Sequence, residues 1–132
     1  MWPPRTTISG PDGRPKLHRY YLVGRGNTFG VFLHHFVASD EAWRMHDHPW
    51  RWAFALVLAG GYREWRLASD GRQWSRWLGR GHINIVSGTD FHRVELPRAR
   101  PAWTLFVHGP KVRRWGFLNL VTRVFELWSP AL

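Results

Sequence analysis

The sequence contains no cysteine, so disulfides, thiolate metal ligands and a cysteine nucleophile are all excluded. It has no apolar run approaching the roughly 18 residues that a membrane-spanning helix needs. Residues 1–7 also lack the apolar stretch of a secretory signal. We therefore expect a cytoplasmic protein that does not enter a membrane.

Acidic residues are scarce, because 9 Asp and Glu stand against 19 Lys and Arg, which gives a formal net charge of +10. Only Lys16 and Lys111 are lysines, and the other 17 cations are arginines. The arginines are scattered along the chain, so we interpret them as a solvated surface. Binding of nucleic acid or of an anionic substrate is the alternative. The sequence has neither a phosphate-binding loop motif nor the G-x-S-x-G motif of serine hydrolases.

Aromatic residues are abundant at 16%, including ten Trp, and they favour strands over helices. Glycine-rich and proline-rich turns, such as residues 24–27 and 60–61, separate short extended segments. This spacing predicts an all-β sandwich or barrel. The expected strands cover residues 17–23, 29–37, 51–59, 61–67, 74–78, 82–86, 91–96, 102–108, 112–118 and 123–128. We expect residues 1–16 to form an irregular N-terminal arm and residues 17–132 to form one β domain.

Three histidines form the most informative pattern in the chain. His46 and His48 are two residues apart, so in an extended segment both imidazoles point the same way. His92 alternates with Val94 and Leu96, which places its side chain on the inward face of a strand. Imidazole suits zinc, copper, iron and nickel, so the three rings predict a transition-metal site without sulfur. Hydrogen-bonded core histidines are the alternative interpretation.

The same residues resemble the motifs of the cupin superfamily. The segment from His46 to Trp50, followed by a strand and by Gly60-Gly61, is similar to the first cupin motif, and residues 81–92 are similar to the second. The resemblance covers roughly residues 30–108. It implies a double-stranded β-helix (a cupin-type jelly-roll barrel) with His46, His48 and His92 as metal ligands, and it also implies a homodimer.

One departure from the cupin pattern bears on the chemistry. Many cupins carry a Glu four or five residues after the second His of the first motif, where this chain has Trp52 and Ala53. The resemblance then implies a three-His site similar to that of thiol, diketone-cleaving and ring-cleaving dioxygenases. We therefore expect a non-haem Fe(II) oxygenase acting on a small organic substrate. The alternatives are a zinc, manganese or nickel isomerase or hydrolytic enzyme, and a non-catalytic module that binds a small ligand, a sugar or nucleic acid.

Four further residues are candidates for catalysis. His34 shares a strand face with Phe32 and so points inward, as a pocket acid or base or a fourth ligand. Glu64 shares a face with Tyr62 and would supply a carboxylate ligand, although an exposed strand Glu is the interpretation we favour. His108 ends a strand and is expected at the mouth of the barrel.

Three residues are candidates for substrate binding. Trp50 and Trp52 would share the face of the two histidines that precede them if no bulge intervenes, which predicts an aromatic wall beside the metal. Arg63 follows the Gly60-Gly61 turn and would hold a substrate carboxylate through two parallel hydrogen bonds, although a surface arginine is the interpretation we favour in so basic a chain.

Overall fold

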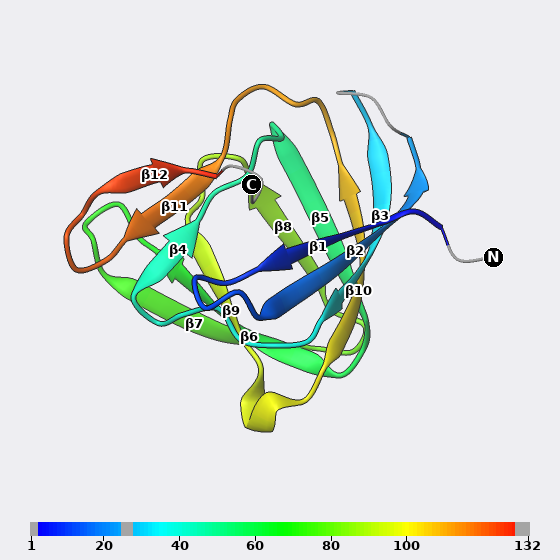
Figure 1. The fold of residues 1–132 in the computed structure, drawn as a ribbon, viewed down its shortest axis with the longest axis horizontal. Helices are drawn as coiled ribbons and strands as arrows, with labels where there is room; N and C mark the ends of the chain where they lie inside the picture. Colours follow the sequence, from blue (N-terminus) through cyan, green and yellow to red (C-terminus); the bar gives the residue numbers. More distant parts are fainter. Residues whose placement is uncertain (1–2, 25–27, 129–132) are drawn as a thin grey trace.

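The computed structural model describes residues 3–24 and 28–128, which form twelve strands in two six-stranded antiparallel sheets. Residues 1–2 of the predicted arm, residues 25–27 of the predicted turn and residues 129–132 lie outside the described part. Sheet 1 has the order β1-β2-β3-β10-β5-β8 and sheet 2 the order β12-β11-β4-β9-β6-β7. In Figure 1 the two sheets curve toward each other, with β11 and β12 at one end of the molecule.

The strands follow the predicted segments closely. The strands of sheet 1 are β1 (Arg5–Ser9), β2 (Pro15–Val23), β3 (Gly30–Phe36), β10 (Ala102–His108), β5 (Trp52–Ala59) and β8 (Ile83–Ser87). The strands of sheet 2 are β12 (Phe125–Leu127), β11 (Gly116–Asn119), β4 (Arg44–His46), β9 (His92–Glu95), β6 (Gly61–Leu67) and β7 (Gln73–Gly79). A short 3-10 turn, Pro97–Ala99, precedes β10. Among the described residues none forms a helix long and apolar enough to cross a membrane.

Two strands were missing from the sequence-based expectation. Residues 5–9, predicted as part of an irregular arm, form β1 and pair with β2 from Arg5↔Tyr20 onward. The prolines and glycines that suggested an arm lie on either side of this strand and in the turn at residues 10–14, where they leave the pairing intact. Strand β4 has only three residues, too few for an alternating pattern to be recognised.

The chain crosses from sheet 1 to sheet 2 at Gly60, between β5 and β6. Gly60 has a φ of 71°, in the left-handed region that glycine enters without a steric cost. A Cβ at this position would also collide with the backbone oxygen of Pro101. This corner brings β6, and with it Tyr62 and Glu64, into the sheet that carries the histidines.

The core lies between the two sheets in two apolar clusters. One cluster contains Val57, Tyr62, Leu78, Val94, Leu96 and Ala102. The other contains Phe32, Trp50, Ala53, Ala55 and Phe106. Alternating residues of β3 and β10 face inward, so both strands contribute every second side chain to this interior. The histidines and a cavity lie in the same interior space.

Candidate metal centre

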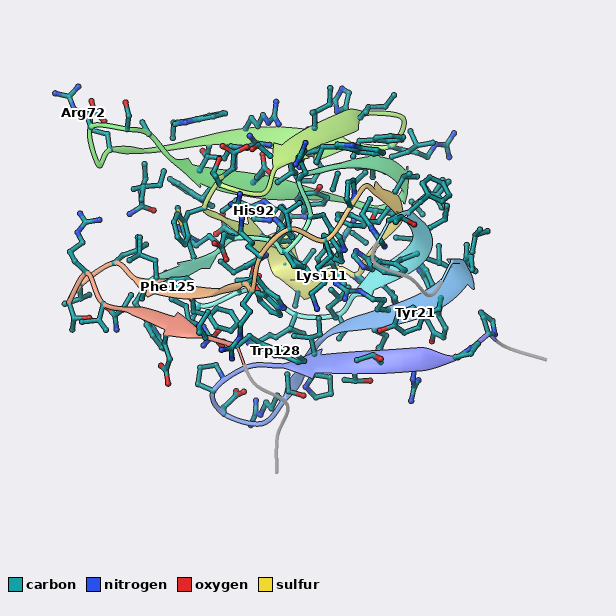
Figure 2. The ribbon with its side chains drawn as sticks, turned by 90° about the horizontal axis from the view of Figure 1, so that it is seen from above. Tyr21, Arg72, His92, Lys111, Phe125 and Trp128 are labelled. Carbon is teal, nitrogen blue, oxygen red and sulfur yellow. The ribbon has the colours of Figure 1, made fainter. Side chains whose placement is uncertain are left out.

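Two neighbouring strands bring His46 and His92 together. His46 is the last residue of β4, His92 is the first residue of β9, and the two are directly paired across the antiparallel ladder. His48 lies two residues farther along, in the loop that leads to β5. Figure 2 shows His92 among the side chains in the middle of the molecule, whereas Arg72 lies at its margin. Residues 46 positions apart in the sequence, His46 and His92, thus meet inside the barrel.

The three imidazoles converge on one point. Their ring centroids are separated by 5.2 Å (His46 and His48), 4.6 Å (His46 and His92) and 4.8 Å (His48 and His92). One nitrogen from each ring lies within 4.8 Å of the others. The Nε2 atoms of His48 and His92 are 3.3 Å apart. Two nitrogens bound to one metal at about 2.0–2.1 Å would be about 2.9–3.4 Å apart in octahedral or tetrahedral geometry, so this pair fits a shared ion.

A buried carboxylate orients His92. Glu64 is 0% exposed, and its Oε2 accepts a 2.8 Å hydrogen bond from Nδ1 of His92. Asn84 donates a 2.6 Å bond to the same oxygen, and the Nε of Arg66 donates a 2.8 Å bond to Oε1. Burial raises the pKa of the Glu64 carboxyl, but the bonds from His92, Arg66 and Asn84 outweigh it and hold this pKa well below its ordinary value. The ionised Glu64 fixes the tautomer of His92 with Nε2 directed at the other two rings, as carboxylates do for metal-bound histidines.

The surroundings keep His46 and His48 neutral. Burial and the neighbouring His92 lower the pKa of both imidazoles well below the ordinary value. Each ring therefore retains a free lone pair at neutral pH, as a metal ligand must. Nδ1 of His48 is buried without a hydrogen-bond partner among the described residues. This Nδ1 is not the atom that faces His92, because the 3.3 Å contact between the two rings is made by Nε2 of His48.

A cavity of about 100 Å³ adjoins the three histidines. Its apolar wall includes Phe36, Trp50, Ala55, Val86, Val94 and Phe106. The cavity exceeds the roughly 15 Å³ that one water needs, so it has room for a small molecule beside the rings.

Two of the four predicted catalytic residues line this cavity. His34 is 3% exposed and faces inward from β3 as predicted, and Arg19 donates a 3.0 Å hydrogen bond to its Nε2. Tyr62 is 3% exposed, and burial followed by the charge of Glu64 raises the pKa of its phenol to about 12. The phenol therefore stays protonated at neutral pH. The roles of both residues in catalysis stay predictions.

Four predicted orientations differ from the structure. Trp52 is 40% exposed, because the loop at residues 47–51 reverses the alternation and turns Ala53 inward instead. Arg63 lies on the outer face of β6, bonded to Ser75 and absent from the cavity lining. The other two corrections concern His108 and Glu64.

His108, expected at the mouth of the barrel, is buried and does not line the cavity. It is 3% exposed, stacks on Trp50 at 4.5 Å and packs on Gly30, where a side chain would leave no room for the ring.

Glu64 is not the exposed strand residue that we favoured, since four hydrogen-bond donors surround its carboxylate in the interior. The remaining candidate, Trp50, is 6% exposed and does line the cavity.

Sequence reasoning missed Arg19, Thr104 and Asp40, which also line the cavity. Arg19 alternates with Leu17 and Tyr21 along one strand, which indicates that its side chain lies on the inward face. Because arginine is abundant in this chain, this pattern is weak evidence. Oδ2 of Asp40 lies 3.8 Å from Nδ1 of His46 and accepts a 2.8 Å bond from the backbone of Val94. A carboxylate thus lies close to the Nδ1 atom of a second histidine.

No protein-family model matches the chain, and no curated protein matches it. Solved structures do match. The chain is similar to an Fe(II)-containing HppE with an alternative substrate, with a TM-score of 0.63 and 15% identity over 79% of this chain and 55% of the other. It is also similar to hydroxypropylphosphonic acid epoxidase from S. wedmorenis, with a TM-score of 0.61, 14% identity and the same two coverages.

A third similar structure is oxalate decarboxylase from Bacillus subtilis, with a TM-score of 0.59 and 18% identity over 83% of this chain and 28% of the other. The chain therefore spans about half the length of the epoxidase and less than a third of the decarboxylase. At these identities the likeness concerns the fold. The two facing antiparallel sheets and these structural neighbours confirm the fold that the resemblance implied: this chain has a double-stranded β-helix fold.

Proposed function

We propose that this protein is a metal-dependent enzyme of the cupin type, a non-haem Fe(II) oxygenase that acts on a small organic substrate. The observation that carries the proposal is the ligand set: three imidazoles converge beside a cavity, and the group they form among the described residues includes no carboxylate. Three histidines leave other coordination positions of the ion open for a substrate. Because the three ligands are neutral, they also leave the positive charge of the ion uncompensated. The Fe(II) of the similar HppE structure supports the choice of metal.

The chain's own residues would perform three tasks around the ion. His46, His48 and His92 would hold it, and Glu64 would orient His92 through the 2.8 Å hydrogen bond to Nδ1. Apolar side chains such as Phe106 and Val94 would exclude water from the cavity. When bound, Fe(II) would supply Lewis acidity and redox chemistry toward the substrate and dioxygen.

Purified protein, prepared without chelator, tests the metal site first. We expect about one divalent metal per chain in the wild type, and a loss of most of it in His46→Ala and His92→Ala. His35→Ala is the matched control, because His35 stacks on Trp103 at 3.8 Å and does not line the cavity. Unchanged metal content in both ligand variants would contradict the site.

Oxygen consumption by the Fe(II)-loaded protein then tests the reaction. We expect a panel of small organic acids to include a substrate that triggers oxygen uptake in the wild type and in His35→Ala, and none in His92→Ala. Turnover of a substrate with zinc, manganese or nickel in the absence of oxygen uptake would instead indicate an isomerase or a hydrolytic enzyme, since the same ligands accept these ions.

A further inference from the structure

Arg19 faces the histidines from the opposite sheet. It lies in the middle of β2, is paired with His34 on β3, and lines the cavity together with all three convergent histidines. Its guanidinium carbon is 4.6 Å from the ring centroid of Phe32 and 5.3 Å from that of Trp50. Two aromatic rings thus hold this cation in the interior, beside the predicted metal.

Arg19 forms no salt bridge with any described carboxylate, unlike the other cations that line the cavity. Lys16 pairs with Glu41 at 2.8 Å, and Arg44 pairs with the same carboxylate at 3.7 Å. The polar partners of Arg19 are neutral groups, the Nε2 of His34 and the side chain of Tyr21. Arg19 is partly shielded from solvent. Because a guanidinium shielded from water without a counterion is destabilised, its position favours the binding of an anion.

Thr104 adds a second unsatisfied group to the same wall. It is 0% exposed, lines the cavity, and its Oγ1 has no hydrogen-bond partner among the described residues. The register of sheet 1 places Arg19 opposite His34 and His34 opposite Thr104. The three side chains therefore form a polar row, Arg19, His34 and Thr104, on the wall of the cavity that sheet 1 contributes.

The charges in the cavity favour the same conclusion. Asp40 is the one carboxylate among the lining residues, and it already accepts a hydrogen bond from the backbone of Val94. A divalent ion on three neutral histidines would add two positive charges to that of Arg19. An anionic ligand would offset this excess in a medium where charges interact strongly.

We propose that the cavity binds a small carboxylate, with its oxygens on Arg19 and on the hydroxyl of Thr104 and with the rest of the molecule directed at the three histidines. This inference deepens the proposed function and rests on it for the side of the ligand that meets the metal. The volume of about 100 Å³ restricts the ligand to a few heavy atoms. Arginine suits this task because its planar fork matches the two oxygens of a carboxylate.

Calorimetric titration with acetate and acetamide tests the inference, because the two probes have the same shape and differ in charge. We expect the Fe(II)-loaded wild type, in buffer with 0.15 M salt, to bind acetate at least about 10-fold more tightly than acetamide. Arg19→Met should weaken acetate binding about 10- to 100-fold and leave the metal content unchanged. Arg63→Met is the matched control, because it removes an arginine from the outer face of β6.

Thr104→Val keeps the shape of the side chain and serves as a second variant if Arg19→Met does not fold. It should weaken acetate binding about 3- to 10-fold. Equal affinity for acetate and acetamide, or acetate binding that neither Arg19→Met nor Thr104→Val changes, would overturn the inference.

Titration of the His92→Ala variant separates the two proposals. If this metal-poor protein still binds acetate in an Arg19-dependent manner, the anion site stands on its own. If the wild type holds no metal but binds acetate in an Arg19-dependent manner, the proposed function is wrong and the inference is upheld. If the wild type holds metal and its acetate binding is independent of Arg19, the inference is wrong and the proposed function is upheld.

Discussion

Nδ1 of His92 donates a 2.8 Å hydrogen bond to Oε2 of Glu64, a carboxylate that solvent does not reach. This pairing gives a physical account of a cupin-like site that lacks the usual glutamate after its first motif. The carboxylate comes from β6 and is hydrogen-bonded to one of the three proposed ligands, while it lies outside the group of three histidines itself. Arg66 and Asn84 hold it there through their own hydrogen bonds.

Replacement of Glu64 by Gln should weaken both the metal site and the fold. Glutamine keeps the size of the side chain but removes the charge that His92 and Arg66 require. We expect metal affinity to fall about 10- to 100-fold and the free energy of unfolding to fall by about 3 kcal/mol. Competition with a chelator and thermal melting measure the two effects.

Glu95→Gln is the control for this change, because Glu95 is exposed and its side chain bonds to the indole of Trp65. Its metal affinity should equal that of the wild type. Wild-type metal affinity in Glu64→Gln would show that the carboxylate does not support the site.

Thr104→Val should stabilise the ligand-free protein by about 1 kcal/mol, since it removes a buried hydroxyl that has no partner among the described residues. Thr6→Val should have the opposite sign, about 1 kcal/mol of destabilisation, because the Thr6 hydroxyl bonds to the hydroxyl of Tyr21 at 2.9 Å. Urea denaturation of the metal-free proteins compares the two. A loss of stability in both variants would mean that the Thr104 hydroxyl is satisfied in solution.

The metal-free protein should lose stability as the pH falls below about 6.5. Burial lowers the pKa of His46 and His48 in the folded state below their ordinary value of 6.5. Between the two pKa values the unfolded chain binds more protons, so acid favours unfolding, and the contribution is fully present above pH 6.5. Thermal melts across pH 5 to 8 should show a smaller pH dependence for His48→Gln. A wild-type midpoint that rises toward pH 5 would contradict this account.

The homodimer that the cupin resemblance implies stays a prediction. We expect the edge strand β8 to form its contact surface, and substitutions on this strand test it. Ile83 and Ile85 are 60% and 71% exposed there, next to Phe54 at 38% on β5. Exposed apolar groups that lie together commonly mark contact surfaces. We expect sedimentation to show a dimer for the wild type and a monomer for Ile85→Lys. A wild type that sediments as a monomer at all concentrations would contradict the dimer.

The convergence of the three histidines was within reach of sequence reasoning because it depends on local alternation. His92, Val94 and Leu96 all face inward as the period of two predicts. The same rule failed between His48 and Trp52, where the loop at residues 47–51 reversed the parity and exposed Trp52. Alternation holds within one strand and carries no information across an irregular loop.

The groups around the histidines were harder to predict because their environment is set by distant strands. Arg66, Arg76 and Asn84 converge on the buried carboxylate of Glu64 on β6 and satisfy it with hydrogen bonds. Seventeen arginines look equivalent in the sequence, and the register of β2 against β3 selects Arg19 as the one paired opposite His34. Arg63, the arginine that the sequence offered for substrate binding, lies outside the cavity and bonds to Ser75.

Anomalous diffraction from a crystal of the Fe(II)-loaded protein, collected on both sides of the iron absorption edge, tests the central claim most directly. We predict one strong peak at about 2.1 Å from a ring nitrogen of each of His46, His48 and His92. No protein carboxylate should lie within bonding distance of that peak. A peak bound elsewhere, or a His92 ring turned away from the other two, would contradict the account.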